Sequence, residues 1–382
     1  MDEYCYNLTC GGFDRSLLPK RNSIRKAFKQ IGTEAYESTM KYSNPLGAYD
    51  FRKAVAENIL PERGIECSKD NILATNGSLH AIFLFGLMLA QHHKKPVVAV
   101  EMPGYSGFRK TLYTLGISTL PLPIDREGAY PDENILSQCN AVILTPRHHF
   151  PTNITMSSSR RNDFYFLAKN KGILLIEDDY SRDFTFLGRN GLPLLSGKLR
   201  DDTMYIGSFS KNFAPGLRIG FVVAETEIIN KLSKLRWRID RHSPELVQVL
   251  LAELIFSGEY GRFVRQTRES YYQRWFTMKT LLQKYFGVRT ERTGGLSFWL
   301  PMPVSWQTLE KIIICAESHG VCLTSGYDCF DNAPPNGVLR LGYASIENSQ
   351  LSEAIELLGR SFSEVTGNSP HMIGKKDDNS EY

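Results

Sequence analysis

The chain has 382 residues, of which 42% are hydrophobic and 23% are charged, values close to those of an average globular protein. This composition excludes a largely disordered chain, and at about 150 residues per domain the length predicts two or three domains. Lys and Arg outnumber Asp and Glu by only 45 to 41, so the charge does not indicate nucleic-acid binding, which needs a basic face or block.

The amino-terminal segment has no basic region followed by an apolar run, so we expect no signal peptide. The longest apolar run, residues 81–90, is shorter than the roughly 18 residues of a membrane-spanning helix and is typical of a buried helix. The seven cysteines include no close Cys-x-x-Cys pair. These features favour a cytoplasmic protein with reduced thiols, without a disulfide framework or a metal site.

Short apolar segments alternate with longer helical segments up to about residue 255. Residues 1–44 are expected to form an arm and part of a small domain, and the four-residue spacing of Phe51, Val55 and Ile59 predicts a helix next. Uniformly apolar strands separated by helices are typical of a parallel sheet covered on both faces. The sequence therefore predicts an α/β domain over residues 45–255. Its strands are expected at residues 97–100, 141–145, 172–178, 204–208 and 218–224.

The remaining chain changes pattern. An amphipathic helix near 246–256 is followed by a long polar helix at about 259–286, which separates off the last region. Residues 256–365 are predicted to form a smaller α+β domain, and the polar, aperiodic residues 366–382 a disordered tail. The small domain is expected to contain strands at 296–300, 321–325 and 338–343 around a helix at 306–319.

Residues 208–218 (SFSKNFAPGLR) carry the most informative pattern in the sequence. Lys211 follows the end of a predicted strand, where open α/β sheets bind ligands. Ser208, Ser210 and Arg218 supply the hydroxyls and the planar guanidinium that bind phosphate oxygens, and a desolvated Lys forms a Schiff base with a carbonyl. A lone loop Lys is usually a solvated surface residue, so the surrounding residues carry this prediction.

This segment resembles the cofactor-lysine motif of fold-type I pyridoxal-phosphate enzymes, the aminotransferase superfamily. It is most similar to the aminotransferase-like domain of MocR-type regulators, and further motifs follow in the same order along residues 10–345. The resemblance implies the PLP-dependent transferase fold, with a mostly parallel seven-stranded sheet in the large domain. It also implies pyridoxal 5'-phosphate bound to Lys211 as a Schiff base.

The resemblance assigns an acid and an aromatic at the end of the strand over 172–178. It places Asp178, two residues before Tyr180, under the pyridine nitrogen, where an ionised carboxylate keeps the ring protonated. It places Tyr180 near the 3′-oxygen of the cofactor. Many members of the superfamily have the acid three residues before the Tyr, which is Glu177 here. Acidic residues that cap the next turn are the structural alternative.

Two more segments resemble cofactor-binding loops. Asn76, Gly77 and Ser78 precede an apolar helix, whose amino terminus favours a phosphate, with Gly77 allowing close backbone approach. Alone, this triplet is also an ordinary turn and helix cap. Tyr105, after the strand at 97–100, matches the aromatic that stacks on the pyridine ring, and a loop Tyr packed on the sheet is its alternative.

Tyr42 and Arg340 lie in the first and last motifs. The Tyr-x-x-Pro-x-Gly segment implies that Tyr42 reaches the phosphate in a neighbouring subunit, and hence a homodimer with shared active sites. Arg340 alternates with Leu339 and Leu341 and so projects from the opposite face of its strand. The resemblance implies that Arg340 binds the substrate α-carboxylate; a structural salt bridge is the alternative.

Two segments depart from the superfamily pattern. The loop Thr145–Asn153 matches Thr-Pro-x-His-Gln-Phe-Pro-Thr-Gly except that His149 replaces Gln and Asn153 replaces Gly. His148 there either contacts the substrate or is an ordinary loop histidine. Gly12 aligns with a segment near the substrate side chain, although the usual proline is missing. The two adjacent histidines lack the ligand spacing of a metal site.

The resemblance implies a transaminase of amino acid metabolism or biosynthesis, which moves an amino group between an amino acid and a 2-oxo acid. A decarboxylase, lyase or amino-acid oxidase on the same scaffold is the first alternative, and a non-catalytic effector-sensing domain is the second. The regulators carry an amino-terminal winged helix of about 100 residues, for which the early positions of Tyr42 and Gly47 leave no room. We therefore expect no nucleic-acid partner. The lack of a long apolar run predicts no membrane partner either.

Overall fold

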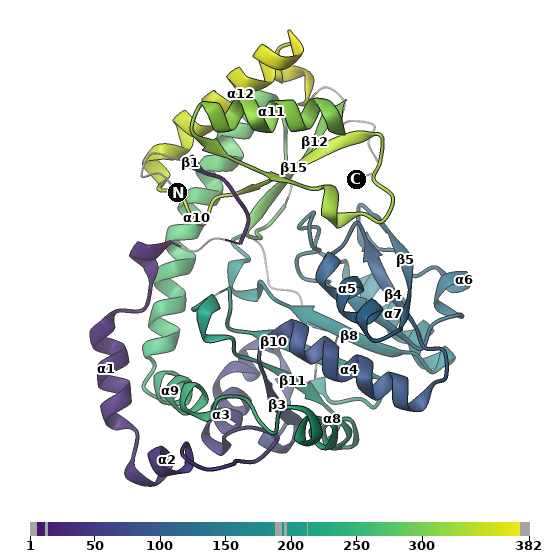
Figure 1. Cartoon of the computed structure of the whole chain (residues 1–382), viewed down its shortest axis with the longest axis vertical. Coiled ribbons are helices and arrows are strands. Elements are labelled where there is room, and N and C mark those ends of the chain that lie inside the picture. Colours follow the sequence, from purple (N-terminus) through teal and green to yellow (C-terminus); the bar gives the residue numbers. More distant parts are fainter. Residues whose placement is uncertain are drawn as a thin grey trace.

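The computed structural model describes residues 6–11, 14–187, 193–194, 197–211, 213–290 and 292–374. The chain forms a large domain built on one sheet and a smaller domain, which lies above the large one in the view of Figure 1. The long helix α10 (Glu259–Phe286) runs along both domains. The predicted α/β class with a smaller α+β domain is confirmed. Within the described residues, no helix is both long enough and apolar enough to cross a membrane.

The sheet of the large domain has the strand order β3-β11-β10-β8-β7-β4-β5-β6. The five expected strands are present, as β4 (Val97–Met102), β7 (Ala141–Leu144), β8 (Leu174–Asp179), β10 (Thr203–Ser208) and β11 (Gly220–Ala224). The sequence analysis did not locate β3 (Ile72–Thr75), β5 (Ser118–Asp125) and the two-residue β6 (Gly128–Ala129). The predicted seven strands are therefore extended by one short edge strand.

Two strands of this mostly parallel sheet run in the opposite direction: β11, and the two-residue β6, which is antiparallel to β5. β11 is antiparallel to both β10 and β3, whereas β10, β8, β7, β4 and β5 are parallel. A parallel connection needs a crossover of a dozen or more residues, usually a helix. Between β10 and β11, the described residues 209–211 and 213–219 contain only a short 3-10 turn, Pro215–Leu217. The chain therefore turns back on itself, and this loop carries Lys211.

Helices cover both faces of the sheet, because alternate residues of each strand point to opposite faces. On β10, Met204 and Ile206 face the core beneath one group of helices, while Tyr205 faces the opposite core. The first core includes α4 (Ser78–His92), α5 (Ser106–Thr114) and α8 (Thr226–Ile239). The opposite face is covered by α3 (Tyr49–Ala54), α7 (Ser158–Lys171) and α9 (Glu245–Phe256). The buried sheet forms a rigid base for the loops at its strand ends.

The small domain contains a three-stranded antiparallel sheet of β12 (Ser297–Ser305), β15 (Asn336–Gly342) and β14 (Thr324–Ser325). Helices α11 (Trp306–Ser318) and α12 (Leu351–Thr366) pack against each other there (Figure 1). The strand expected at 321–325 is divided into β13 (Val321–Cys322) and β14. The amino-terminal β1 (Tyr6–Asn7) pairs with β13, whereas α1 (Arg21–Gln30) and α2 (Thr33–Ser38) contact α9 of the large domain.

The prediction of a disordered tail from residue 366 is wrong for residues 366–374. A 3-10 turn, Pro370–Met372, follows α12, and Ile373 is buried in the core of the small domain. The turn contacts α10 and α12, and one buried apolar residue leaves no periodic pattern in the sequence. The prediction for residues 375–382 lies outside the described residues.

The expectation of seven reduced thiols also fails at one position. Cys322 is disulfide-bonded. Sequence spacing did not reveal this bond, because strand pairing decides which cysteines meet. The free thiols in the described part of the chain are Cys10, Cys67, Cys139, Cys315 and Cys329.

Candidate active site

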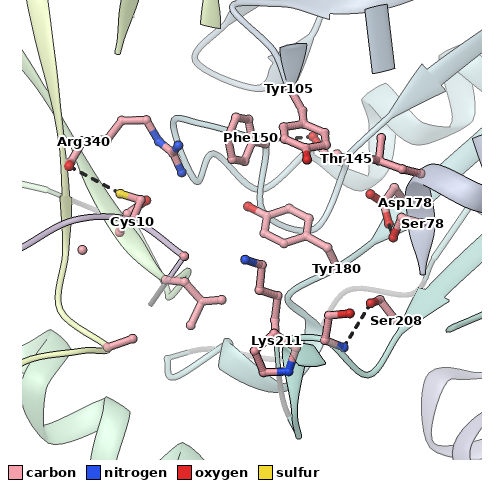
Figure 2. A pocket seen from close by; sticks show the side chains of 18 of the residues that line it. Cys10, Ser78, Tyr105, Thr145, Phe150, Asp178, Tyr180, Ser208, Lys211 and Arg340 are labelled. Atoms are coloured by element: carbon pink, nitrogen blue, oxygen red, sulfur yellow. Dashed lines mark hydrogen bonds between the residues drawn. The ribbon is translucent and has the colours of Figure 1, made fainter. Parts of the chain in front are cut away.

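A cavity of about 330 Å³ lies where the carboxyl ends of the parallel strands face the small domain. The large domain contributes its strand-end loops, and the small domain contributes β15 and residues near β12 (Figure 2). The cavity therefore joins segments that are far apart in the sequence. Of the side chains predicted to form the site, those that line it are Ser78, Tyr105, Asp178, Tyr180, Ser208, Ser210, Lys211, Arg218 and Arg340.

Lys211 projects into this cavity from the loop between β10 and β11 (Figure 2). Burial lowers the pKa of its amine, and the positive charge of Arg340 lowers this pKa further. A lowered pKa increases the fraction of neutral amine, which is the nucleophilic form. The position and the electrostatics of Lys211 therefore suit covalent chemistry with a carbonyl compound.

Hydrogen-bond donors gather at one end of the cavity. Arg218 donates from Nη2 to the backbone oxygen of Asn76 at 3.1 Å, and its Nη1 lies 3.5 Å from Ser210 Oγ. Gly77, with φ +92°, precedes α4, and a Cβ at this position would lie 2.9 Å from Arg218 Nη2. The first N–H groups of a helix have no partner within that helix. The arrangement provides a cradle for a phosphate dianion.

The three consecutive acids at the end of β8 have different surroundings. Asp178 lines the cavity and accepts a hydrogen bond from Ser78 Oγ at 3.1 Å. Glu177 is buried away from the cavity lining, where its carboxylate accepts the backbone N–H of Leu194 at 2.5 Å. Position therefore favours Asp178 over Glu177 as the acid of the site.

Burial raises the pKa of Asp178 to about 7, and the neighbouring acids Asp179 and Glu177 add to this effect, while the Ser78 hydroxyl opposes it. Within the described residues, no ion pair involves Asp178. A buried carboxylate without a cationic partner is costly. A cationic ring nitrogen next to this carboxyl would supply that partner and restore its ionised form.

Asp179 belongs to a separate buried network. Its carboxylate lies 3.2 Å from Arg147 Nε and accepts the hydroxyl of Tyr205 at 2.7 Å. Although burial alone would raise the pKa of Asp179, the charges of Arg147 and Arg63 hold it below its usual value. This carboxylate therefore stabilises the protein beneath the sheet end and does not reach the cavity.

Three aromatic rings, those of Tyr105, Phe150 and Tyr180, form a group in the cavity (Figure 2). The Phe150 ring lies 5.2 Å from that of Tyr105 and 6.1 Å from that of Tyr180, measured between centroids. Buried Glu101 accepts the backbone N–H of Thr145 at 3.0 Å, and the Thr145 hydroxyl accepts the N–H of Phe150 at 3.0 Å. These bonds fix the loop that carries Phe150.

Arg340 enters the cavity from β15, on the face opposite to buried Leu339 and Leu341. Within the described residues its guanidinium makes no ion pair, and its buried Nε has no hydrogen-bond partner. The structural salt bridge considered as an alternative is therefore not found in the described part of the chain. An unpaired guanidinium facing a cavity provides a fork for a carboxylate.

These residues fit pyridoxal phosphate. The cradle at Gly77 and Arg218 matches its phosphate, buried Asp178 matches its ring nitrogen, and Lys211 matches its aldehyde. Tyr105, Phe150 and Tyr180 all line the cavity, and their rings suit a flat aromatic ligand.

Four of the described residues predicted for the site are not among those that line the cavity, namely Asn76, Gly77, Tyr42 and His148. Asn76 and Gly77 lie next to the guanidinium of Arg218, which does line it. Tyr42 is 83% exposed and packs edge-on against His242. His148 is buried, and its ring nitrogens lie 2.8 Å from Ser181 Oγ and 3.2 Å from Thr185 Oγ1. These contacts hold it beneath the site, so the expectation that it contacts the substrate is not supported. Gly12 lies outside the described residues.

The cavity also contains residues that the sequence analysis did not identify. Cys10 lies beside Arg340, whose backbone oxygen is 3.4 Å from the thiol sulfur. Phe108 on α5, Tyr271 on α10 and Leu296 before β12 complete the apolar part of the wall. No local signal distinguishes these residues from core positions of their elements, because only the packing of the two domains brings them together.

Comparisons with known proteins agree with this geometry. The family described as Aminotransferase class I and II matches residues 8–358. The chain is 29% identical to the HTH-type transcriptional regulator TauR of Rhodobacter capsulatus, covering 88% of this chain and 68% of TauR. It is 28% identical to the 2-aminoadipate transaminase of Thermus thermophilus, covering 92% of this chain and 88% of that protein.

Solved structures show the same fold. The α-aminoadipate aminotransferase LysN from Thermus thermophilus, complexed with N-(5'-phosphopyridoxyl)-L-leucine, superposes with a TM-score of 0.83 at 26% identity. The match covers 96% of this chain and 94% of LysN. The kynurenine aminotransferase of Pyrococcus horikoshii superposes with a TM-score of 0.84 at 23% identity, covering 95% and 92% of the two chains.

Proposed function

Because the chain belongs to the class I and II aminotransferase family, we propose that Lys211, Asp178 and Arg340 are the residues that carry its reaction. The chain is a pyridoxal-phosphate-dependent transaminase, which moves an amino group between an amino acid and a 2-oxo acid. The observation that supports the three roles most strongly is their convergence on one cavity from two domains.

When bound, pyridoxal phosphate supplies an electron sink that stabilises negative charge on the substrate α-carbon. Ser78, Ser208, Ser210 and Arg218 would hold its phosphate, together with the backbone at Asn76 and Gly77. Asp178 would keep the ring nitrogen protonated, because its buried carboxylate gains a cationic partner in return. Tyr105 would pack on the ring, and Tyr180 would lie at its edge.

Lys211 would have two duties. Its Nζ would hold the cofactor, and the same amine would take up the proton that leaves the substrate α-carbon. Both duties need a neutral amine, and the lowered pKa of Lys211, caused by burial and by Arg340, provides one. Its place in a short loop after β10 keeps the amine within the closed cavity.

Arg340 would orient the substrate by binding its α-carboxylate with two parallel N–H groups. Phe150 supports the guanidinium from one side, with its ring centre 4.1 Å from Cζ. When the carboxylate and the amine of the substrate are both held in place, they determine which bond of its α-carbon faces Lys211. The amino acid would therefore be held in one orientation during proton transfer.

A homodimer with shared active sites is the second part of this proposal. Tyr42 is largely exposed and does not line the cavity of its own chain, which suits a side chain that reaches a neighbouring subunit. Sedimentation measurements would test the dimer, and mixing Tyr42→Phe with Lys211→Ala chains would test sharing. The cytoplasmic location expected from the sequence stays a prediction, which cell fractionation would test.

The decisive experiment locates the cofactor. Borohydride reduction of the purified holoenzyme, followed by peptide mapping, should find the phosphopyridoxyl group on Lys211. Mixing the enzyme with an amino acid panel and 2-oxoglutarate should give the keto acid and glutamate. Carbon dioxide, ammonia or peroxide as the product would instead indicate a decarboxylase, a lyase or an oxidase on this scaffold. The absence of turnover would indicate an effector-sensing role.

A further inference from the structure

A cluster of three potential metal ligands lies in the small domain, away from the cavity. Cys315 is in the last turn of α11, His319 is the residue that caps this helix, and Glu364 is near the end of α12. Cys315 and His319 are four residues apart, so their side chains share one face of the helix. Their ligand atoms and the Glu364 carboxylate all lie within 4.8 Å of one another.

Two separations that involve Glu364 are close to those of a tetrahedral metal site. Glu364 Oε2 lies 3.4 Å from Cys315 Sγ and 3.6 Å from His319 Nε2. With bonds of about 2.3 Å to sulfur and about 2.0 Å to nitrogen and oxygen, tetrahedral zinc places sulfur and oxygen about 3.5 Å apart and nitrogen and oxygen about 3.3 Å apart. The two separations from Glu364 therefore need to change only by a few tenths of an ångström. Cys315 Sγ and His319 Nε2 lie within 4.8 Å of each other, and zinc would draw these two atoms to about 3.5 Å.

The hydrogen bonds behind His319 select the tautomer that a metal requires. The hydroxyl of buried Ser361 donates to the Leu357 carbonyl at 2.9 Å. Having used its hydrogen there, this hydroxyl accepts from His319 Nδ1, which is 3.0 Å away. Nδ1 therefore carries the hydrogen, and in the neutral ring the lone pair of Nε2 faces the thiol and the carboxylate. Metal-bound histidines are usually oriented in this way.

The carboxylate of Glu364 is oriented as well. Arg360, one turn earlier on α12, binds Oε1 through Nε at 2.8 Å. This ion pair leaves Oε2 directed toward Cys315 and His319. The carboxyl end of α11 also favours a cation, because the helix dipole is negative there.

We propose that Cys315, His319 and Glu364 form a zinc-binding site that links α11 to α12, with water as the fourth ligand. Sulfur, imidazole and carboxylate ligands in tetrahedral geometry suit Zn²⁺. Binding would replace the thiol proton, which passes to the solvent, so that the thiolate and the carboxylate neutralise the two charges of the metal. No residue of this site lines the active-site cavity, so its role is to fix the two helices.

The test uses the holoenzyme, purified without chelators and dialysed against Zn²⁺. Metal analysis should find one more equivalent of zinc in the wild type than in Cys315→Ser and in His319→Gln. With Co²⁺ as the probe, the wild type should show visible bands of tetrahedral cobalt at wavelengths beyond the cofactor band, and both variants should lack them. A Cys67→Ser, His92→Gln double variant is the matched control, and it should bind zinc and cobalt as the wild type does.

Two further variants separate ligation from folding. Glu364→Gln, on the exposed side of α12, keeps the shape of the side chain and should weaken zinc binding at least tenfold. Ser361→Ala leaves all three ligands and should weaken it about 10–100-fold, because the His319 tautomer is no longer fixed. Transaminase activity reports that each variant is folded. Equal zinc uptake by the wild type and the ligand variants, or cobalt spectra unchanged by Cys315→Ser, would overturn the proposal.

Discussion

The guanidinium carbon of Arg340 lies 4.1 Å from the centre of the Phe150 ring. Arg340 belongs to β15 of the small domain, and Phe150 to the loop after β7 of the large domain, so this contact crosses the active-site cavity (Figure 2). A guanidinium without an ion-pair partner is held in position by the face of the ring. Substrate binding would therefore meet an arginine that is already oriented.

Replacing the aromatic ring should weaken substrate binding. Cation–π contacts contribute about 0.5–2 kcal/mol, so Phe150→Leu should raise KM for the amino acid donor about 2–30-fold and change kcat less. Phe150→Tyr keeps the ring and is the matched control. Steady-state kinetics at saturating cofactor measure both values, and an unchanged KM in Phe150→Leu would show that the ring does not support Arg340.

Replacing the guanidinium itself should have a larger effect. Arg340→Lys keeps the positive charge but loses the bidentate fork. Hydrogen bonds to charged groups contribute about 1.5–3 kcal/mol, so kcat/KM should fall about 10–150-fold. The affinity for pyridoxal phosphate, measured by titration of the visible absorbance, should change little. A parallel loss of cofactor affinity would instead place Arg340 against the cofactor.

Asp178→Asn should slow catalysis. Loss of the charge beside the ring nitrogen should lower kcat about 10²–10³-fold, the usual cost of removing one electrostatic contact from an active site. Single-turnover rates with the bound cofactor measure this loss. Glu177→Gln is the neighbouring comparison, and a larger kcat loss in that variant would assign the role to Glu177.

The same substitution should change the pH dependence of cofactor-free stability. Burial raises the pKa of Asp178 in the folded protein to about 7, above the value of about 3.9 expected when unfolded. The folded state therefore binds more protons, and stability is lost as the pH rises from about 4 to 7. This loss is at most about 4 kcal/mol for a shift of this size. The urea midpoint of wild-type apoprotein should be lower at pH 8 than at pH 5. This difference should be smaller in Asp178→Asn.

Asp179→Asn should lower the free energy of unfolding. This substitution removes the negative charge that lies 3.2 Å from Arg147 Nε and weakens the acceptor of the Tyr205 hydroxyl. Breaking one side of a buried ion pair costs about 3–5 kcal/mol. Urea unfolding should show this decrease, which the Asp178→Asn variant should not reproduce at neutral pH. Wild-type stability in Asp179→Asn would contradict the buried network.

Gly77→Ala should impair cofactor binding. Gly77 has φ +92° and ψ 176°, a conformation that essentially only glycine adopts, and a Cβ there would lie 2.9 Å from Arg218 Nη2. We expect the Kd for pyridoxal phosphate to rise at least tenfold, at a strain of about 1–3 kcal/mol. Gly116→Ala, with φ +71° and open space around it, is the control. It should lose stability without losing cofactor affinity.

The sequence alone determined the α/β class and most strands, because apolar periodicity reflects burial directly. The residue pattern around Lys211 singled out this side chain, whereas Asp178 and Arg340 followed from the family resemblance. It did not locate β5, where Pro121 and Pro123 interrupt the pattern. Prolines are tolerated there because β5 has only the two-residue β6 on its outer side.

Only the tertiary structure decided which candidates meet. Neighbouring residues on a strand face opposite ways, so Asp178 enters the cavity while Glu177 and Asp179 bind other partners. His148 matched a motif but is held beneath the site by two hydroxyls. Cys10 and Tyr271 carry no local signal, yet domain packing brings them to the wall of the cavity. Local patterns specify elements, whereas a site depends on long-range packing that no short segment encodes.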